Sequence, residues 1–252
     1  MDIIWLSSNK FGYELLKELI QLEDVKKHIK SIITLSDKSK TIMYDGIERK
    51  KWYEFGIDVI EIEDINKEEK LIKKLSPDLI VACGWRQLIK KDILNIPKNG
   101  IVGFHPTLLP IGRGPAPIIN SILHDFKKSG VTMFYVSEGL DDGDIIGQEE
   151  FVMESSDHAE EVYEKVIESG RKLIRKYLPM LIEGVAPRTP QDNSKAIIFK
   201  KPKLQDNKIN FDETTLDHAY KKIRALSKPY NGAYIEKDGK KLILWRAELL
   251  EK

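Results

Sequence analysis

The chain has 252 residues, of which 41% are hydrophobic and 32% charged, and 41 Lys and Arg residues almost balance 40 Asp and Glu residues. A formal net charge of +1 gives no reason to expect broad electrostatic binding to nucleic acid, and a single cysteine, Cys83, excludes an internal disulfide framework and a four-cysteine zinc site. We expect a globular cytoplasmic protein without a signal peptide, since the N-terminal residues lack that pattern and no run of about 18 apolar residues predicts a membrane span.

Short apolar runs alternate with helical patterns over the first 150 residues. The runs predict strands over residues 2–7, 30–36, 58–62, 78–84, 100–105, 130–137 and 145–153. Helical spacing follows residues 8 and 9, returns through residues 65–75, and is found again over about 116–126. Continuous apolar strands between helices predict an α/β fold with a mostly parallel sheet and helices on both faces.

The C-terminal third has a different pattern. A long helix is predicted over about 158–183 with Asp157 as its N-cap, and the turn formers of residues 184–194 predict a linker. Beyond it we expect a helix over 216–227 and a β-hairpin that turns at Asp238 and Gly239. The chain is therefore divided into a catalytic domain, residues 1–184, and a linker with a short C-terminal appendage, residues 185–252.

One histidine occupies a position where this architecture places chemistry. His105 ends the strand predicted over 100–105 and precedes Pro106, which disfavours a helix. Ligands of open α/β sheets bind beyond the carboxyl ends of the strands, and an imidazole there can act as acid or base near neutral pH. A purely structural histidine is the alternative.

A second polar cluster is "SEGLDDGDIIGQ", residues 137–148, which has four carboxylates in seven residues. It lacks the alternating ligands and closing Glu of an EF-hand, so we expect no metal. A solvated turn is one interpretation, and an aspartate that orients His105 is another.

The two segments together resemble the folate-dependent formyltransferase family, which includes methionyl-tRNA, glycinamide ribonucleotide and sugar N-formyltransferases. The resemblance rests on "GFHPTLLPIGRGPAP" at residues 103–117 and "GVTMFYVSEGLDDGDIIGQ" at residues 130–148, with Asp141 36 positions after His105. It extends from about Ile3 to Glu183 and continues weakly into the appendage. It implies a Rossmann-like catalytic domain and 10-formyltetrahydrofolate as co-substrate.

The resemblance also implies roles for particular residues. His105 would stabilise the oxyanion or take a proton from the attacking amine, and Asp141 would orient its ring. The pterin would enter between residues 83–89 and residues 140–145. The expected folate-binding residues are Trp85, Arg86, Gln87, Leu88, Ile89, Leu140, Asp142 and Asp144, although packing within the loop would also explain Trp85 and Arg86.

One position departs from the family pattern, in which an Asn stands two residues before the histidine. Gly103 occupies that position here. Loss of such an oxyanion donor costs about 10²–10³ in rate in a comparable site. We expect compensation by Asn120, Thr107, a backbone N–H group or water; an impaired enzyme is the alternative.

The acceptor is expected to be a nucleotide-linked amino sugar, of the UDP- or dTDP-4-amino-4,6-dideoxy type. The short appendage and near-zero net charge resemble that class, and nucleic acid and membranes are not expected as partners. The expected acceptor-binding residues are Pro106, Thr107, Arg113 and Gly114. The alternatives are a methionyl-tRNA formyltransferase-like enzyme, a catalytically impaired folate-binding protein and a formyltetrahydrofolate hydrolase; the oligomeric state is open, with a dimer as one option.

Overall fold

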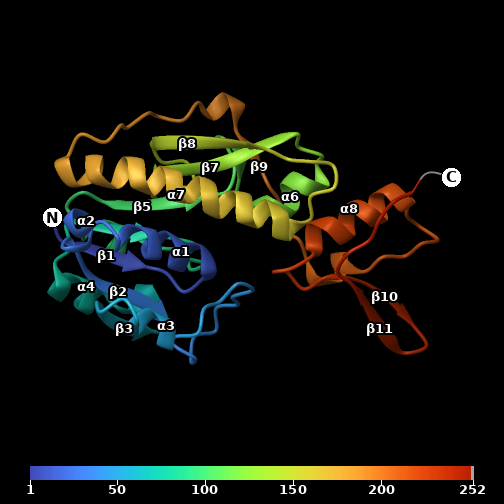
Figure 1. The fold of residues 1–252 in the computed structure, drawn as a ribbon, viewed down its shortest axis with the longest axis horizontal. Coiled ribbons are helices and arrows are strands. Elements are labelled where there is room, and N and C mark those ends of the chain that lie inside the picture. The colour runs from blue at the N-terminus through green and yellow to red at the C-terminus, as the bar shows by residue number, and fades with distance from the viewer. Residues whose placement is uncertain (251–252) are drawn as a thin grey trace.

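The centre of the molecule is a seven-stranded sheet, seen in a computed structural model that describes residues 1–250 (Figure 1). Its strand order is β3-β2-β1-β4-β5-β7-β8. The first five strands in this order are parallel, and β7 runs antiparallel to both of its neighbours, β5 and β8. The mostly parallel α/β sheet expected from the apolar runs is confirmed. The strands are β1 Ile3–Leu6, β2 Ile29–Leu35, β3 Asp58–Ile62, β4 Leu79–Ala82, β5 Ile101–His105, β7 Lys128–Tyr135 and β8 Ile145–Val152.

Helices cover both faces of this sheet because its strands are apolar on both sides. In β1, Trp5 packs into the cluster formed with α1, α6 and α7, whereas Leu6 packs into the cluster formed with α4 and α5. Successive side chains of a strand point to opposite faces, so a fully apolar strand requires two covering layers. The helices are α1 Lys10–Leu19, α2 Glu23–Lys26, α3 Lys50–Tyr53, α4 Glu69–Leu75, α5 Lys91–Leu94, α6 Pro117–Leu123 and α7 Ala159–Glu183.

The start of α7 differs by one residue from the expected one. His158, not Asp157, is the N-cap, and its backbone N–H donates to the Glu161 carboxylate at 2.9 Å. The Asp157 carboxylate instead accepts from the Glu154 N–H at 2.8 Å and pairs with Lys165. Its side chain therefore closes the preceding turn.

The C-terminal segment returns to the catalytic domain before it forms the appendage. After α7, a short strand β9 (Ile197–Ile198) pairs in parallel with β6 (Ile111–Arg113), which lies in the loop after His105. Helix α8 (Leu216–Leu226) then packs against α6 and α7. The predicted hairpin is confirmed as β10 (Ala233–Lys237) and β11 (Lys240–Leu244), and Figure 1 shows it projecting from the body of the molecule.

The carboxyl ends of the parallel strands meet at one edge of the sheet. β1 is followed there by Ser7, β4 by Cys83, and β5 ends at His105. Residues distant in sequence are therefore brought together where open α/β sheets bind ligands. Over residues 1–250, the helices include none with the length and apolar character that a membrane span requires.

Candidate active site

His105 is the last residue of β5 and pairs with Thr132 of β7 across the sheet. The residue is only 6% exposed, and its Nε2 atom lies 2.7 Å from the carbonyl oxygen of Gly112. A carbonyl oxygen can only accept a hydrogen bond, so Nε2 carries a proton and donates it. In the neutral ring, Nδ1 therefore has a free lone pair.

The Nδ1 atom of His105 faces the carboxylate of Asp141, with Oδ2 at 3.6 Å. Burial lowers the pKa of His105 below its ordinary value, while the charge of Asp141 and the Gly112 carbonyl act in the opposite direction. A buried imidazole with a lowered pKa is mostly neutral at pH 7, which is the form that can accept a proton. The arrangement suits a general base.

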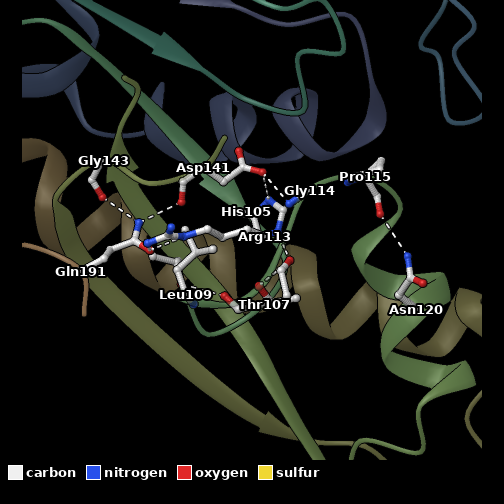
Figure 2. Close-up of polar contacts among 12 residues, drawn as sticks. His105, Thr107, Leu109, Arg113, Gly114, Pro115, Asn120, Asp141, Gly143 and Gln191 are labelled. Atoms are coloured by element: carbon white, nitrogen blue, oxygen red, sulfur yellow. Dashed lines mark hydrogen bonds and ion pairs between the residues drawn. The ribbon is translucent and has the colours of Figure 1, made fainter. Parts of the chain in front are cut away.

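A hydrogen bond to its side chain and an unusual backbone conformation together define the position of Asp141. Its Oδ2 accepts a hydrogen bond from the Gly114 N–H at 2.9 Å, and its backbone has φ +48°, in the left-handed region. Figure 2 shows its carboxylate directed toward both His105 and Gly114. The two segments singled out in the sequence therefore meet at this pair.

Of the expected acceptor-binding residues, Arg113 is buried and Gly114 contributes its N–H to Asp141. The Arg113 guanidinium donates to Gln191 at 2.7 and 3.0 Å and to Asn193 at 2.8 Å. It thus joins the loop after His105 to the linker. Contact of Arg113 or Pro106 with an acceptor stays a prediction.

The two expected substitutes for the family Asn are both engaged elsewhere. The Asn120 amide donates to the carbonyls of Pro115 and Ala116 at 3.0 Å and to that of Lys200 at 3.3 Å. Figure 2 shows Asn120 on α6, apart from His105 and Asp141. Thr107 is buried and its hydroxyl faces the Gly112 carbonyl at 3.4 Å. The Asn120 amide therefore makes structural hydrogen bonds in this fold, and its donation to an oxyanion stays a prediction that these contacts do not support.

Gly103, the position of the family Asn, is closely flanked by Val136 and Phe134. It lies two residues before His105 on β5 and therefore on the same face of the strand. A Cβ atom there would lie 3.0 Å from Cγ2 of Val136 and 3.5 Å from Cε1 of Phe134. The end of a valine side chain can move by a few tenths of an ångström, so the position can accept a side chain.

The two loops expected around a pterin lie side by side. An ion pair joins Lys91, just after the first loop, to Glu138, just before the second, at 2.9 Å. Leu88 of the first loop is 74% exposed and Leu140 of the second is 50% exposed. The Trp85 indole N–H is buried with no hydrogen-bond partner. Contact of Trp85, Leu88 or Leu140 with a pterin stays a prediction.

Other side chains of these loops have partners within the protein. The Gln87 amide bonds to the Ile65 N–H, the Thr41 hydroxyl and the Glu63 carbonyl, all within 2.9 Å. Asp142 accepts from the Ser137 hydroxyl, and Asp144 pairs with Arg188 at 3.4 Å. Ile89 is buried in the core. Any contact of these four residues with folate would therefore come mainly from their backbone.

Sequence reasoning missed a buried carboxylate at the same edge of the sheet. The side chain of Asp45 is 1% exposed and accepts from Asn9 at 2.9 Å, from Arg86 at 2.7 Å and from the Tyr163 hydroxyl. Burial and the Asp45 charge raise the pKa of Tyr163 far above its ordinary value, so that hydroxyl stays a donor. An aspartate in a polar loop gives no sign in the sequence that it will be buried. Its role here is to fix the direction of Arg86.

The chain is similar to known proteins along most of its length. The family model described as formyl transferase matches residues 6–178, and that of the formyl transferase C-terminal domain matches residues 201–252. A methionyl-tRNA formyltransferase of Macrococcus caseolyticus is 32% identical over 99% of this chain and 80% of its own length.

Solved structures share the fold at lower identity. A sugar N-formyltransferase from Shewanella has a TM-score of 0.78 at 23% identity, covering 100% of this chain and 99% of that one. An N-formyltransferase from Helicobacter canadensis, in complex with folinic acid and dTDP-3-aminofucose, has a TM-score of 0.72 at 21% identity, covering 95% and 85%.

Proposed function

The chain belongs to the folate-dependent formyltransferase family, and we propose that it moves a formyl group from 10-formyltetrahydrofolate to the amine of a nucleotide-linked amino sugar. The folate co-substrate follows from family membership. The observation that carries the proposal is the His105–Asp141 pair at the carboxyl end of β5. The sugar class, and a 4-amino-4,6-dideoxy sugar within it, is the finer part of the proposal.

The residues of the pair have distinct tasks. The Nδ1 lone pair of His105 takes the proton that the acceptor amine must lose as it attacks the formyl carbon. The Asp141 carboxylate stabilises the imidazolium that results. When the bond between the formyl carbon and N10 of the folate breaks, the proton held by His105 goes to N10, and tetrahydrofolate is the leaving group. Trp85, Leu88 and Leu140 would contact the pterin ring.

Charge supports a small acceptor over a polyanion. The net charge of the chain is +1. Two cations next to the site are already paired with carboxylates, Arg86 with Asp45 and Lys91 with Glu138. A protein that binds RNA contacts the phosphates with Lys and Arg side chains that are not paired with carboxylates. One structure with the same fold is named a sugar N-formyltransferase and another was solved with dTDP-3-aminofucose, which agrees with this choice.

Methionyl-tRNA is the second candidate acceptor. One specific observation favours it, since the curated relatives at 30–34% identity are methionyl-tRNA formyltransferases. Exposed Lys200, Lys201 and Lys203 follow β9, which pairs with the loop of Arg113, so a local contact with phosphates has a place on the surface.

Competition between acceptors separates the two candidates. The protein would be incubated with 10-formyltetrahydrofolate, a panel of UDP- and dTDP-linked amino sugars, and methionyl-tRNA, and formyl adducts would be identified by mass spectrometry. The proposal predicts an amino sugar whose mass has increased by that of CO, because a formyl group replaces one hydrogen of the amine. Formylation of methionyl-tRNA alone would establish the second candidate instead.

A further inference from the structure

Gln191 of the linker makes four hydrogen bonds with the two loops of the candidate site. Its amide Nε2 donates to the carbonyl oxygens of Asp141 at 2.9 Å and Gly143 at 2.7 Å. Its Oε1 accepts from Nε and Nη2 of Arg113 at 3.0 and 2.7 Å. Figure 2 shows Gln191 between these two partners, so both ends of the amide are satisfied.

The 141–143 loop needs such support. Asp141 has φ +48°, a conformation that costs free energy for a residue other than glycine and persists where its surroundings enforce it. Gly114 binds the Asp141 side chain, and Gln191 binds its main chain. Gly114 directly follows Arg113, which Gln191 also binds, so one linker residue sets the position of both loops.

The linker is itself anchored at this place. β9 pairs with β6, with Ile197 opposite Ile111 and Ile198 opposite Arg113. The Phe199 N–H donates to the Arg113 carbonyl at 2.8 Å. The linker that carries Gln191 is therefore held beside the loop of Arg113 from Ile197 onward.

We propose that Gln191 is a positioning residue for formyl transfer, which acts by fixing the Asp141 carboxylate at Nδ1 of His105. The inference rests on the proposed catalytic role of that pair. If Gln191 has this role, residues 184–199 are a functional part of the site. These residues lie between the two parts of the chain that the family models match, 6–178 and 201–252.

The position of Asp141 can be measured without knowledge of the acceptor. Asp141 is the charged group that acts on His105, and its carboxylate raises the pKa of the buried ring. The hydrogen bond to the Gly112 carbonyl acts on the pKa in the same direction. If Asp141 moves away, the pKa of His105 should fall further. Only five histidines are present, so the His105 ring resonance can be assigned by its loss in His105→Ala and titrated by NMR.

Three variants separate positioning from general stability. Gln191→Met keeps the side-chain volume but loses all four hydrogen bonds, and Gln191→Glu keeps an acceptor for Arg113 but loses the two donors to the 141–143 loop. Gln205→Met makes the matched change at an exposed glutamine of the appendage. Thermal unfolding would identify any variant that fails to fold.

We expect Gln191→Met to lower kcat by about 10- to 100-fold, as a small displacement of a catalytic group does, and to lower the His105 pKa. Gln191→Glu should lower kcat similarly, and Gln205→Met should change neither quantity. A folded Gln191→Met with the wild-type kcat and His105 pKa would overturn the inference, as would wild-type kcat in Gln191→Glu.

Two reference variants keep this test separate from the proposed function. If His105→Ala and Asp141→Asn retain transfer, the catalytic assignment fails, and the His105 titration still decides whether Gln191 positions Asp141. If those two variants lose transfer while Gln191→Met retains it, only the positioning inference fails.

Discussion

Nδ1 of His105 lies 3.6 Å from Oδ2 of Asp141, while Nε2 of the same ring donates to the Gly112 carbonyl at 2.7 Å. The second contact fixes the tautomer, and the tautomer leaves the basic nitrogen beside the carboxylate. A proton taken up at Nδ1 would then lie between the two groups. The pair is thus arranged to accept a proton and to stabilise it.

Replacement of His105 should abolish transfer but leave the folate pocket. We expect His105→Ala to lower kcat by about 10²–10⁴, the range for loss of a general base. Binding of 5-formyltetrahydrofolate, measured by calorimetry, should stay within about threefold of wild type. Near wild-type turnover in the variant would give His105 a structural role.

The pH dependence of the wild type should have an acid limb controlled by His105. The neutral ring is the active form, and its lowered pKa means that kcat falls only as pH drops below about 6.5. At higher pH the ring is neutral, so kcat should no longer depend on the protonation of His105. An acid limb centred well above pH 7 would contradict this assignment.

Asp141→Asn should shift this acid limb to lower pH. The carboxylate raises the pKa of His105, so its removal lets the pKa fall, while kcat at neutral pH drops at least about tenfold because the imidazolium loses its counter-charge. Asp238→Asn, at the exposed hairpin turn, is the charge-matched control. An acid limb that does not move would mean that Asp141 does not act on His105.

Gly103→Asn tests whether the missing amide limits the rate. The backbone of Gly103 is ordinary β strand, and an added Cβ would contact Val136 at 3.0 Å. We expect kcat to rise by up to about 10-fold over Gly103→Ala, which adds the Cβ without the amide, because an oxyanion donor is restored. Equal rates in the two variants would show that other donors already stabilise the oxyanion.

Asn120→Ala should affect stability more than catalysis. Its amide donates to three partly buried carbonyls, and the loss of a hydrogen bond of this kind costs about 0.5–1.5 kcal/mol. Chemical denaturation should report this loss, with kcat within about threefold of wild type. A large fall in kcat without destabilisation would restore Asn120 as a catalytic group.

Much of the fold could be predicted because the strands are apolar on both faces. Residues 58–62 form a strand with the predicted bounds, and the order of strands and helices follows the pattern of apolar runs. The two short strands β6 and β9 could not be predicted, since Ile111–Arg113 and Ile197–Ile198 are too short to form a periodic pattern.

The residues of the candidate site that lie within recognisable sequence motifs could be predicted. His105 and Asp141 do meet, as the spacing of the two segments led us to expect. The partners of Arg113 and Arg86 could not be predicted, because Gln191 and Asp45 reach them across 78 and 41 positions and lie in polar loops. Such contacts depend on tertiary structure, and local sequence carries no sign of them.

The most direct test of the account is a single-turnover assay of wild type and His105→Ala with 10-formyltetrahydrofolate and the acceptor panel, with formyl product and tetrahydrofolate quantified together. We predict equal amounts of formyl-sugar and tetrahydrofolate from the wild type, and no product from His105→Ala that still binds folate. A wild-type protein that binds folate but forms no product with any acceptor would contradict the account and indicate a folate-binding protein without transfer activity.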